Sequence, residues 1–581
     1  MSDYKYPIED ATFVLNTLVD FDGLCSKAGL EEVNSELAAA VLEEAAKLGS
    51  GVLAPLNRDG DQIGAKWSES GVTETPGFAD AYHQFAEGGW MGLTQSEEIG
   101  GQNLPNVLGT AVNEIWQSAN MAWALCPLLT QGAMEAISHH ASAQLQAAYL
   151  PKMAAGEWTG TMNLTEPDAG SDLAVVKTKA EPKGDAYAIS GQKIFITWGD
   201  HQMTDNIVHL VLARLPDAPE GVKGISLFVV PKFILNAEGE AGEPNSVRCL
   251  SIEHKLGIHG SPTCVMSFEG ATGYLVGEPN KGLMYMFTMM NHARQAVGLQ
   301  GLSIAERATQ QAVAYARERI QGRRPDGSKM PIIEHPDVKR MLLQARACNE
   351  AMRALALVAS AELDYAAAAG GEDAAAHNAR AALFTPIVKG WMTELAQEIT
   401  SLGVQVHGGM GFIEETGAAQ HYRDARILPI YEGTNGIQAL DLTGRKLSMD
   451  QGATLTALLD EMDLHVAEAR TQARLPQAQI DALAAAVAQA RESAQTLLAD
   501  RELGTAAAFH FMMQMGYLCG GWLLTRSVSA LGSAGVSDAF AHNKQLTAQF
   551  YLEQMLPRAA AHASALQHGH ATLSDFPEEA F

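Results

Sequence analysis

The sequence is poor in cysteine and in basic residues. Six of its 581 residues are cysteine, they are scattered along the chain, and none stands in a CxxC spacing. This usage is typical of reduced thiols, so we expect a reducing compartment and a cytoplasmic protein. Lys and Arg number 40 against 67 Asp and Glu, a formal net charge of −27. An excess of acids spread along the chain disfavours nucleic acid as a partner.

Signal, membrane and metal-site patterns are also missing. The first residues, MSDYKYPIEDATF, do not place a basic stretch before an apolar one, so no secretory signal is visible. The most apolar window, Ala506 to Thr525, contains His510, Gln514 and glycines, which favours a buried bundle helix over a membrane span. No His, Cys and carboxylate group has zinc-site spacing, so we expect no metal.

Hydrophobic periodicity predicts an α+β chain that is mostly α. Apolar residues recur at helical spacing over 34–53 and 106–155, whereas APLNRDGDQIG (54–64) breaks this spacing and predicts a loop. Between Thr159 and Gly277, short segments rich in Val, Ile, Phe and Thr, such as YAISGQKIFIT and GISLFVVPKF, predict an antiparallel strand domain. Helical spacing resumes near Lys281.

The order of these blocks excludes a doubly wound sheet, in which strands and helices would alternate throughout. We expect four domains. They are an N-terminal helical domain (1–158), a middle β domain (159–281), a helical bundle (282–447) and a further helical extension (448–581).

Three loop-like stretches could carry chemistry. LTEPDAGSDL (164–173) follows a predicted strand, and its N–H groups suit a heterocycle edge or a pyrophosphate, although a plain turn is equally compatible. In GQKIFITWG (191–199), Phe195 and Thr197 share a strand face. QVHGGMGF (405–412) has glycines that permit close backbone approach to a phosphate, and its His407 fits a hydrogen-bonded structural residue better than a metal ligand.

The stretch YEGTNGI (431–437) places one acid, Glu432, beside an aromatic ring in a turn. If that carboxylate is shielded from water, its ionised form is disfavoured, its pKa rises and it becomes a stronger base. On spacing alone, a helix cap or a surface ion pair is the alternative for Glu432.

Taken together, these motifs resemble the acyl-CoA dehydrogenase family. LTEPDAGSDL, GQKIFIT, ARERIQGR, and VQVHGGMGF followed by RDARILPIYEGTNGIQ occur in the family's order, and the resemblance covers roughly residues 80–447. It implies an N-terminal helical domain, a middle antiparallel β-barrel domain, a C-terminal four-helix bundle, bound FAD and a homodimer. It also implies an acyl-CoA substrate, an electron-transfer flavoprotein as electron acceptor, and no integral membrane association.

The resemblance also assigns roles to individual residues. Glu432 matches the catalytic base that removes the α-proton of the acyl thioester. The positions that match FAD contacts are Met162, Leu164, Thr165, Gly170, Ser171, Phe195, Thr197, Arg319, Gln321, Gln405, Gly409 and Thr434. The positions that match substrate contacts are Ser171, Asn291, Arg294, Tyr431 and Gly433.

Three positions depart from the family pattern. Phe195 stands where Trp is frequent, Gly322 where Phe is frequent, and Asn291 where many members have Asp. The first two make the flavin wall and the adenine contact less secure, and the third removes a charge near the CoA side.

The helical extension, the YPIEDATFVL segment and MMNHARQAVGLQG resemble the 3-(methylthio)propanoyl-CoA dehydrogenase group of dimethylsulfoniopropionate degradation. That thioester is therefore the expected substrate. A short-, medium- or long-chain fatty acyl-CoA of fatty acid metabolism is the alternative. An acyl-CoA oxidase and a non-catalytic flavoprotein or acyl-CoA-binding scaffold are further alternatives. The ending EEAF, in place of the peroxisomal SKL, mildly disfavours the oxidase, and the intact YEGT argues against the scaffold, which needs no base at position 432.

Overall fold

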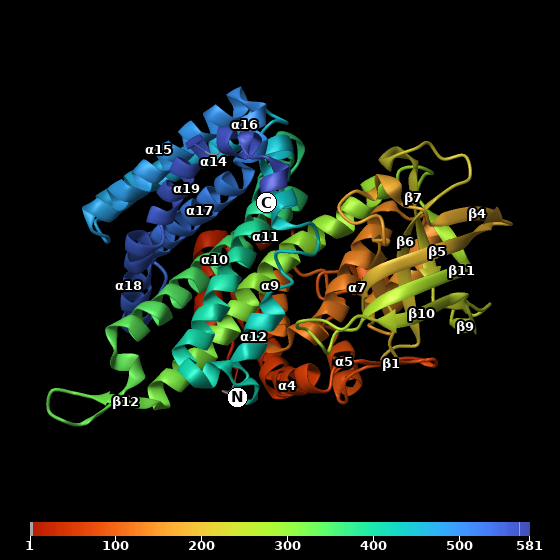
Figure 1. The fold of residues 1–581 in the computed structure, drawn as a ribbon, viewed down its shortest axis with the longest axis horizontal. Helices are drawn as coiled ribbons and strands as arrows, with labels where there is room; N and C mark the ends of the chain where they lie inside the picture. Colours follow the sequence, from red (N-terminus) through yellow and green to blue (C-terminus); the bar gives the residue numbers. More distant parts are fainter. Residues whose placement is uncertain (1–3, 569) are drawn as a thin grey trace. The chain divides into compact units, whose positions relative to one another are not determined.

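The computed structural model describes residues 4–568 and 570–581, and the chain divides into two compact units (Figure 1). The first unit contains the N-terminal segment up to Ala46, Pro105–Ser118 and Arg294–Phe581. The second contains Lys47–Leu104 and Ala119–Ala293. The long helix α9 (Gly282–Glu318) begins in the second unit and continues in the first.

The second unit is built around a seven-stranded sheet. Its strands are β3 (Trp158–Asn163), β4 (Lys179–Lys183), β5 (Ala186–Thr197), β6 (Asn206–Arg214), β7 (Ile225–Pro231), β10 (Val247–Ile252) and β11 (Thr263–Val276). The pairings β11–β5, β5–β4, β4–β6, β6–β7 and β7–β11 return to the starting strand, so the sheet closes into a barrel. Closure leaves fewer free strand edges.

The strands predicted between Thr159 and Gly277 are confirmed, and they enclose an apolar core that includes Ile189, Phe228 and Phe268. The sheet is not antiparallel throughout, because β3 pairs with β6 in parallel, with Met162 opposite Leu210. A parallel pair needs a long crossover connection. Residues 164–205, with β4 and β5, form that connection and place the LTEPDAGSDL loop directly after β3.

Helices and short strands complete the second unit. They are α4 (Ala54–Gln62), α5 (Phe78–Glu87), α7 (Met121–His140), α8 (Ala143–Ala154), β1 (Lys66–Ser68), β2 (Gly71–Thr73), β8 (Phe233–Leu235) and β9 (Ala241–Pro244). The expectation of a loop over 54–64 is wrong, because Ala54–Gln62 is helical. Pro55 lies in the first turn of α4, where its missing N–H costs nothing and its fixed φ suits a helix, and the buried Ala54, Asn57 and Gly60 share one face.

Long helices dominate the first unit, and α9, α10 and α11 lie side by side (Figure 1). Its helices before the extension are α1 (Ile8–Val14), α2 (Phe21–Lys27), α3 (Ser35–Leu48), α6 (Asn106–Ala119), α10 (Pro336–Ala368), α11 (Gly371–His407), α12 (Ala418–Ala425) and α13 (Asn435–Leu440). A two-stranded hairpin of β12 (Ile320–Arg323) and β13 (Lys329–Pro331) follows α9 directly.

The extension continues the first unit with α14 (Ala453–Gln472), α15 (Gln477–Ala499), α16 (Arg501–Ala506), α17 (Ala508–Ala530), α18 (Asp538–Gln554), α19 (Pro557–His568) and α20 (His570–Asp575). Helix α17 is buried along most of its length and contacts α10 and α11. The prediction of a buried bundle helix at Ala506 to Thr525 is confirmed, and within residues 4–568 and 570–581 no helix has the length and apolar character to cross a membrane.

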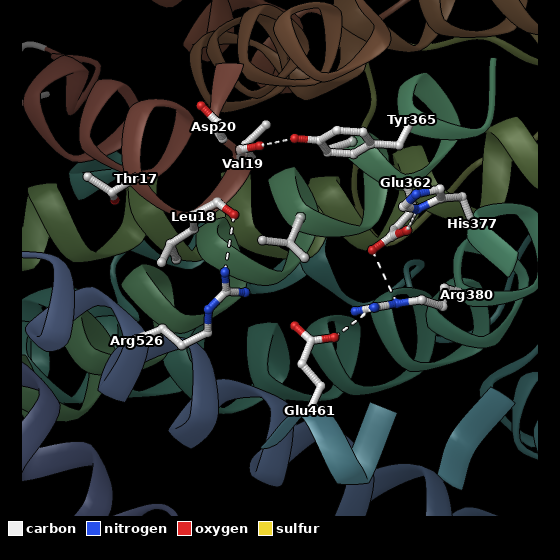
Figure 2. A pocket seen from close by; sticks show the side chains of 12 residues that line it. Thr17, Leu18, Val19, Asp20, Glu362, Tyr365, His377, Arg380, Glu461 and Arg526 are labelled. Atoms are coloured by element: carbon white, nitrogen blue, oxygen red, sulfur yellow. Dashed lines mark hydrogen bonds and ion pairs between the residues drawn. The ribbon is translucent and has the colours of Figure 1, made fainter. Parts of the chain in front are cut away.

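Polar contacts attach the extension to the rest of the first unit (Figure 2). Arg380 of α11 pairs with Glu461 of α14 at 2.7 Å, and Arg526 of α17 donates to the carbonyl oxygen of Leu18 at 3.5 Å. These side chains line a cavity of about 270 Å³ among α10, α11, α14 and α17.

A buried charge cluster joins the two ends of the chain. Arg353 of α10 pairs with Glu114 of α6 at 2.7 Å, with Glu306 of α9 at 3.1 Å and with Asp10 of α1 at 2.8 Å. Lys544 of α18 also pairs with Asp10. Because each of these charges has lost most of its water, each depends on its partners.

We expect Arg353→Met to lower the free energy of unfolding by about 3 to 5 kcal/mol, because it leaves Glu114 buried without its counter-charge and Asp10 with Lys544 alone. The matched control is Arg248→Met, which removes an exposed pair with Glu269 (70% and 56% side-chain exposure) and should change stability by at most about 1 kcal/mol. Urea denaturation followed by circular dichroism measures both. Equal midpoints for the two variants would contradict a structural role for the cluster.

Candidate functional site

Glu432 lies in a strained turn between α12 and α13. Its φ is +56°, and that of Gly433 is +82°, so two consecutive residues are left-handed. A non-glycine residue in this region costs about 1 to 3 kcal/mol and persists only where the surroundings hold it. Thr434 ends the turn as the N-cap of α13, where its hydroxyl accepts the N–H of Ile437 at 3.2 Å.

Glycine is required at position 433 on two counts. Its φ is positive, and an ideal Cβ there would lie 2.7 Å from Nε2 of Gln438. The amide of Gln438 donates weakly, at 3.4 Å, to the carbonyl oxygens of both Glu432 and Gly433. A Cβ at position 433 would therefore strain the backbone and displace the Gln438 side chain from the turn.

The carboxyl group of Glu432 is poorly hydrated but retains some exposed surface. Burial raises the pKa of Glu432 to about 7, and the nearby Arg294 and Lys389 oppose that rise. Arg294 lies in α9 and is itself buried, which lowers the pKa of its guanidinium, while Glu432 and Asp441 act in the other direction. A carboxyl group with a pKa near neutrality is suited to general-base work.

Tyr431 anchors the turn from the other side. Its hydroxyl donates to Oε1 of Gln300 in α9, and Nε2 of Gln300 donates at 3.1 Å to Gln117 of α6. Burial raises the pKa of Tyr431 well above its usual range, so this hydroxyl stays protonated as a donor. The structure thus brings together four of the expected residues, Arg294, Tyr431, Glu432 and Gly433, with Thr434 directly beyond them.

In the second unit, Glu166 holds the LTEPDAGSDL loop in shape. Its carboxylate accepts from Nζ of Lys193 at 2.8 Å, from the hydroxyl of Thr178 at 2.6 Å and from the N–H of Lys177 at 2.7 Å. Lys193 lies in β5 and is fully buried. Burial lowers the pKa of Lys193 to about 8, against the opposing effect of Glu166.

The loop exposes part of its surface. Gly170 and Ser171 are exposed, Met162 and Thr165 are partly exposed, and Leu164 is buried. The carbonyl of Thr165 accepts the N–H of Ile194 in β5 at 2.9 Å, which ties the loop to the strand carrying Phe195.

Phe195 projects from a β-bulge. The pairing of β5 with β11 shifts between Lys193 and Ile196, so Ile194 and Phe195 together face one residue of β11. The φ of Phe195 is +59°, and its ring is 58% exposed. Bulges re-aim side chains at functional sites. Beyond the bulge, Ile196 is buried and Thr197 partly exposed, consistent with Phe195 and Thr197 sharing one open face.

A second group of expected residues gathers at one end of α9 and α11. Tyr315 of α9 stacks on His407 of α11 with ring centroids 4.5 Å apart, one turn before Arg319 and two residues before Gly409. His407 also bonds the carbonyl of Gly403 at 2.7 Å, which confirms it as a hydrogen-bonded structural residue. Four of the expected residues close to this stack in sequence are exposed: Arg319, Gln321, Gln405 and Gly409.

Two residues of the site were not anticipated. Lys389 of α11 lies close to Glu432, Asn435 is the first residue of α13, and both are buried. The sequence does hold a signal for Lys389, a single charge inside the apolar run FTPIVKGWM. Asn291 is exposed in the part of α9 that belongs to the second unit, and its expected role stays a prediction.

Comparison with known families accounts for most of the chain. The models described as acyl-CoA dehydrogenase N-terminal, middle and C-terminal domains match residues 43–157, 161–271 and 280–447. The chain belongs to the acyl-CoA dehydrogenase family. A model described as "Acetyl-CoA dehydrogenase C-terminal like" matches residues 458–577, within the extension.

Among curated relatives, the 3-methylmercaptopropionyl-CoA dehydrogenase of Ruegeria pomeroyi is 47% identical over 97% of this chain and 98% of its own length. A butyryl-CoA dehydrogenase of Syntrophomonas wolfei is 32% identical over 100% of this chain and 99% of its own length. Among solved structures, an acyl-CoA dehydrogenase of Bacillus anthracis complexed with FAD shares the fold, with a TM-score of 0.74, 22% identity and coverage of 92% of this chain and 89% of that one.

This acyl-CoA dehydrogenase is an FAD-dependent oxidoreductase, and the residues present fit that cofactor. An exposed aromatic ring at Phe195 and the hydroxyls of Thr165 and Ser171 suit a flavin and its ribityl chain. In the first unit, an ideal Cβ at Gly408 or Gly409 would meet nothing within 4 Å, so a phosphate could approach the backbone there closely, with Arg319 nearby as a cation, although the N–H of Gly408 already donates to the carbonyl oxygen of Gln405.

We expect Lys193→Met to loosen the 164–178 loop, because Glu166 would remain buried without its cation. FAD binding should weaken about tenfold or more, since ~1.4 kcal/mol of loop ordering corresponds to a factor of ten. Lys177→Met is the control, because its pair with Asp168 is exposed (72% and 69%). FAD titration and hydrogen exchange at the amide of Thr178, which donates to Glu166 at 3.0 Å, measure both effects. Unchanged exchange in Lys193→Met would refute the anchoring role of Glu166.

Proposed function

We propose that Glu432 is the catalytic base of an α,β-dehydrogenation that converts an acyl-CoA thioester into the trans-2-enoyl-CoA. The observation that carries this proposal is the position of Glu432, a poorly hydrated carboxyl group whose pKa burial raises to about 7, held in a left-handed turn. A base of that pKa is mostly ionised just above neutral pH and retains a strong affinity for a proton.

In this mechanism the carboxylate of Glu432 takes the proton from the carbon next to the thioester carbonyl. Negative charge then develops on the thioester oxygen, which needs hydrogen-bond donors. In the described part of the chain, the N–H of Glu432 donates no backbone hydrogen bond, so it is available to that oxygen. FAD, when bound, supplies the acceptor for the hydride that leaves the β-carbon.

Other residues position the substrate and exclude water in this proposal. Tyr431, partly exposed and anchored on Gln300, forms an aromatic wall beside the base. Arg294 contributes positive charge close to Glu432. We assign Asn291, Gly433 and Ser171 to substrate contacts, on their match to the family positions. The residues expected at FAD keep that assignment here, and Thr434 also caps α13.

The preferred substrate in this proposal is 3-(methylthio)propanoyl-CoA. The 47% identity to the 3-methylmercaptopropionyl-CoA dehydrogenase, over nearly the full length of both chains, supports it. A short straight-chain acyl-CoA is the second candidate, supported by the full-length relative named as a butyryl-CoA dehydrogenase.

The proposed assembly is a homodimer, with an electron-transfer flavoprotein as the electron acceptor. Around Gly409 the chain exposes Met410 (48%) and Phe412 (85%), next to the exposed Arg319 and Gln321. Large exposed apolar side chains gathered at one place mark an interaction surface. The four-domain division given above is retained as part of this proposal, since three of the four family matches fall within its boundaries and the fourth, 280–447, begins two residues before its domain. The six free cysteines support a reducing compartment such as the cytoplasm.

Glu432→Gln should retain bound FAD and lose turnover, because the amide keeps the shape of the side chain and cannot accept the α-proton. The measurement is bleaching of the yellow protein by 3-(methylthio)propanoyl-CoA without oxygen, beside the FAD content of the same sample. The control, Glu414→Gln, removes an exposed carboxylate that pairs with Arg423, and should bleach like the wild type. Bleaching by Glu432→Gln at the wild-type rate would remove Glu432 as the base.

The same anaerobic assay on the wild type separates the substrate candidates. The proposal expects a higher ratio of bleaching rate to half-saturating concentration with 3-(methylthio)propanoyl-CoA than with butyryl-CoA or octanoyl-CoA. The reverse order would favour the second candidate. Hydrogen peroxide release in air at the dehydrogenation rate would indicate an oxidase.

For the assembly, light scattering of the full chain with FAD should give a particle of two chains, and Phe412→Asp should shift it towards one chain, since a charge at a buried contact is costly. Phe581→Asp is the control, because Phe581 is also largely exposed (95%, against 85% for Phe412) and lies far from Gly409 in sequence. A single-chain wild-type particle would contradict the proposed dimer.

A further inference from the structure

Lys389 is an unusual residue for the middle of a bundle helix. Its side chain has no exposed surface, and burial lowers the pKa of its ammonium group to about 7. Burying an ammonium group costs several kcal/mol unless opposite charge and hydrogen bonds compensate for the lost water. Glu432 and Glu394 provide the opposite charge, while Arg294 opposes it.

The nearest polar partner of Lys389 belongs to the helix that follows the base. Nζ of Lys389 donates to Oδ1 of Asn435 at 2.8 Å. Nδ2 of Asn435 donates to Oε1 of Glu394 at 2.8 Å, to the hydroxyl of Thr393 at 2.9 Å and to the carbonyl of Gly390 at 3.2 Å. One buried amide thus fixes the beginning of α13 to a turn and a half of α11.

That attachment point lies three residues after Glu432. The turn between them contains the two left-handed residues Glu432 and Gly433, which need continuous restraint. The side chains of Thr434 and Gln438 restrain it through contacts of 3.2 to 3.4 Å, whereas the bonds of Asn435 to Lys389 and Glu394 are shorter. The Asn435 contact is therefore the main link between the base and the rigid helix α11.

We propose that Lys389 is a positioning residue for the base, which clamps Asn435 and supplies the buried positive charge that favours the ionised form of Glu432. This inference rests on the proposed role of Glu432 and names a second residue on which that role depends. The clamp comes from the hydrogen bond to Asn435, and the charge effect comes from the ammonium group. The two contributions can be separated by substitution.

The charged and titratable groups around the pair are few. Glu432 faces Arg294 from α9, Lys389 from α11 and the hydroxyl-bearing Tyr431. Lys389 additionally faces Glu394 from its own helix. Since Lys389 and Glu432 titrate over the same range of pH, the acidic limb of the rate profile belongs to the pair.

Two substitutions distinguish charge from clamp. Lys389→Gln removes the charge and retains an N–H donor for Asn435, whereas Lys389→Met removes both. We expect the acidic limb of the anaerobic flavin-reduction rate to move up by about one pH unit in both variants, because an opposite charge that favoured the carboxylate is gone. The plateau rate at high pH should fall by about tenfold or more in Lys389→Met only, since only that variant frees the turn.

Thr393→Val is the matched control, because it removes a neutral member of the same contact and should leave the position of the acidic limb unmoved. A Lys389→Gln profile that coincides with the wild type, in protein with full FAD content, would overturn the charge role. If neither variant retains FAD, Lys389→Arg keeps the charge and should leave the limb in place; a shifted limb would overturn the inference. Loss of turnover in Glu432→Gln together with a wild-type profile in Lys389→Gln would reject this inference alone, whereas full turnover in Glu432→Gln would reject the proposed function.

Discussion

The carboxylate of Glu432 is shielded from water and held in a strained backbone turn. Desolvation raises the pKa of Glu432 to about 7, and the positive charges of Arg294 and Lys389 limit that rise. A fully solvated acid would be a weak base, and a fully buried acid without nearby cations would stay protonated. The proposed role of Glu432 requires the intermediate pKa that these groups set.

Much of the first unit serves to hold that turn. Helix α11 carries Lys389, Thr393 and Glu394 to Asn435, while α9 carries Gln300 to Tyr431. The buried charge cluster around Arg353 links α1, α6 and α18 to α9 and α10. Residues near both ends of the chain therefore support the helices that position Glu432.

Helix spacing and strand composition were sufficient to predict α10, α11, α14, β5 and β11 from the sequence, and the YEGT motif indicated Glu432. Three features could not be predicted in this way. Helix α4 was not predicted, because Ala54–Gln62 has the composition of a turn. Pro55 lies in the first turn of this helix, where it does not break the helix. The parallel pairing of β3 with β6 and the contact of Asp10 with Lys544 depend on chain segments far apart in sequence.

The raised pKa of Glu432 is tested most directly by measuring the ionisation of its carboxyl group. Infrared difference spectra of the FAD-loaded enzyme, recorded across pH and compared with Glu432→Gln, isolate the carboxyl band of this one side chain. The account predicts that the band titrates with a midpoint near pH 7. A midpoint at the ordinary glutamate value of about 4.3 would show a solvated carboxylate and contradict the account.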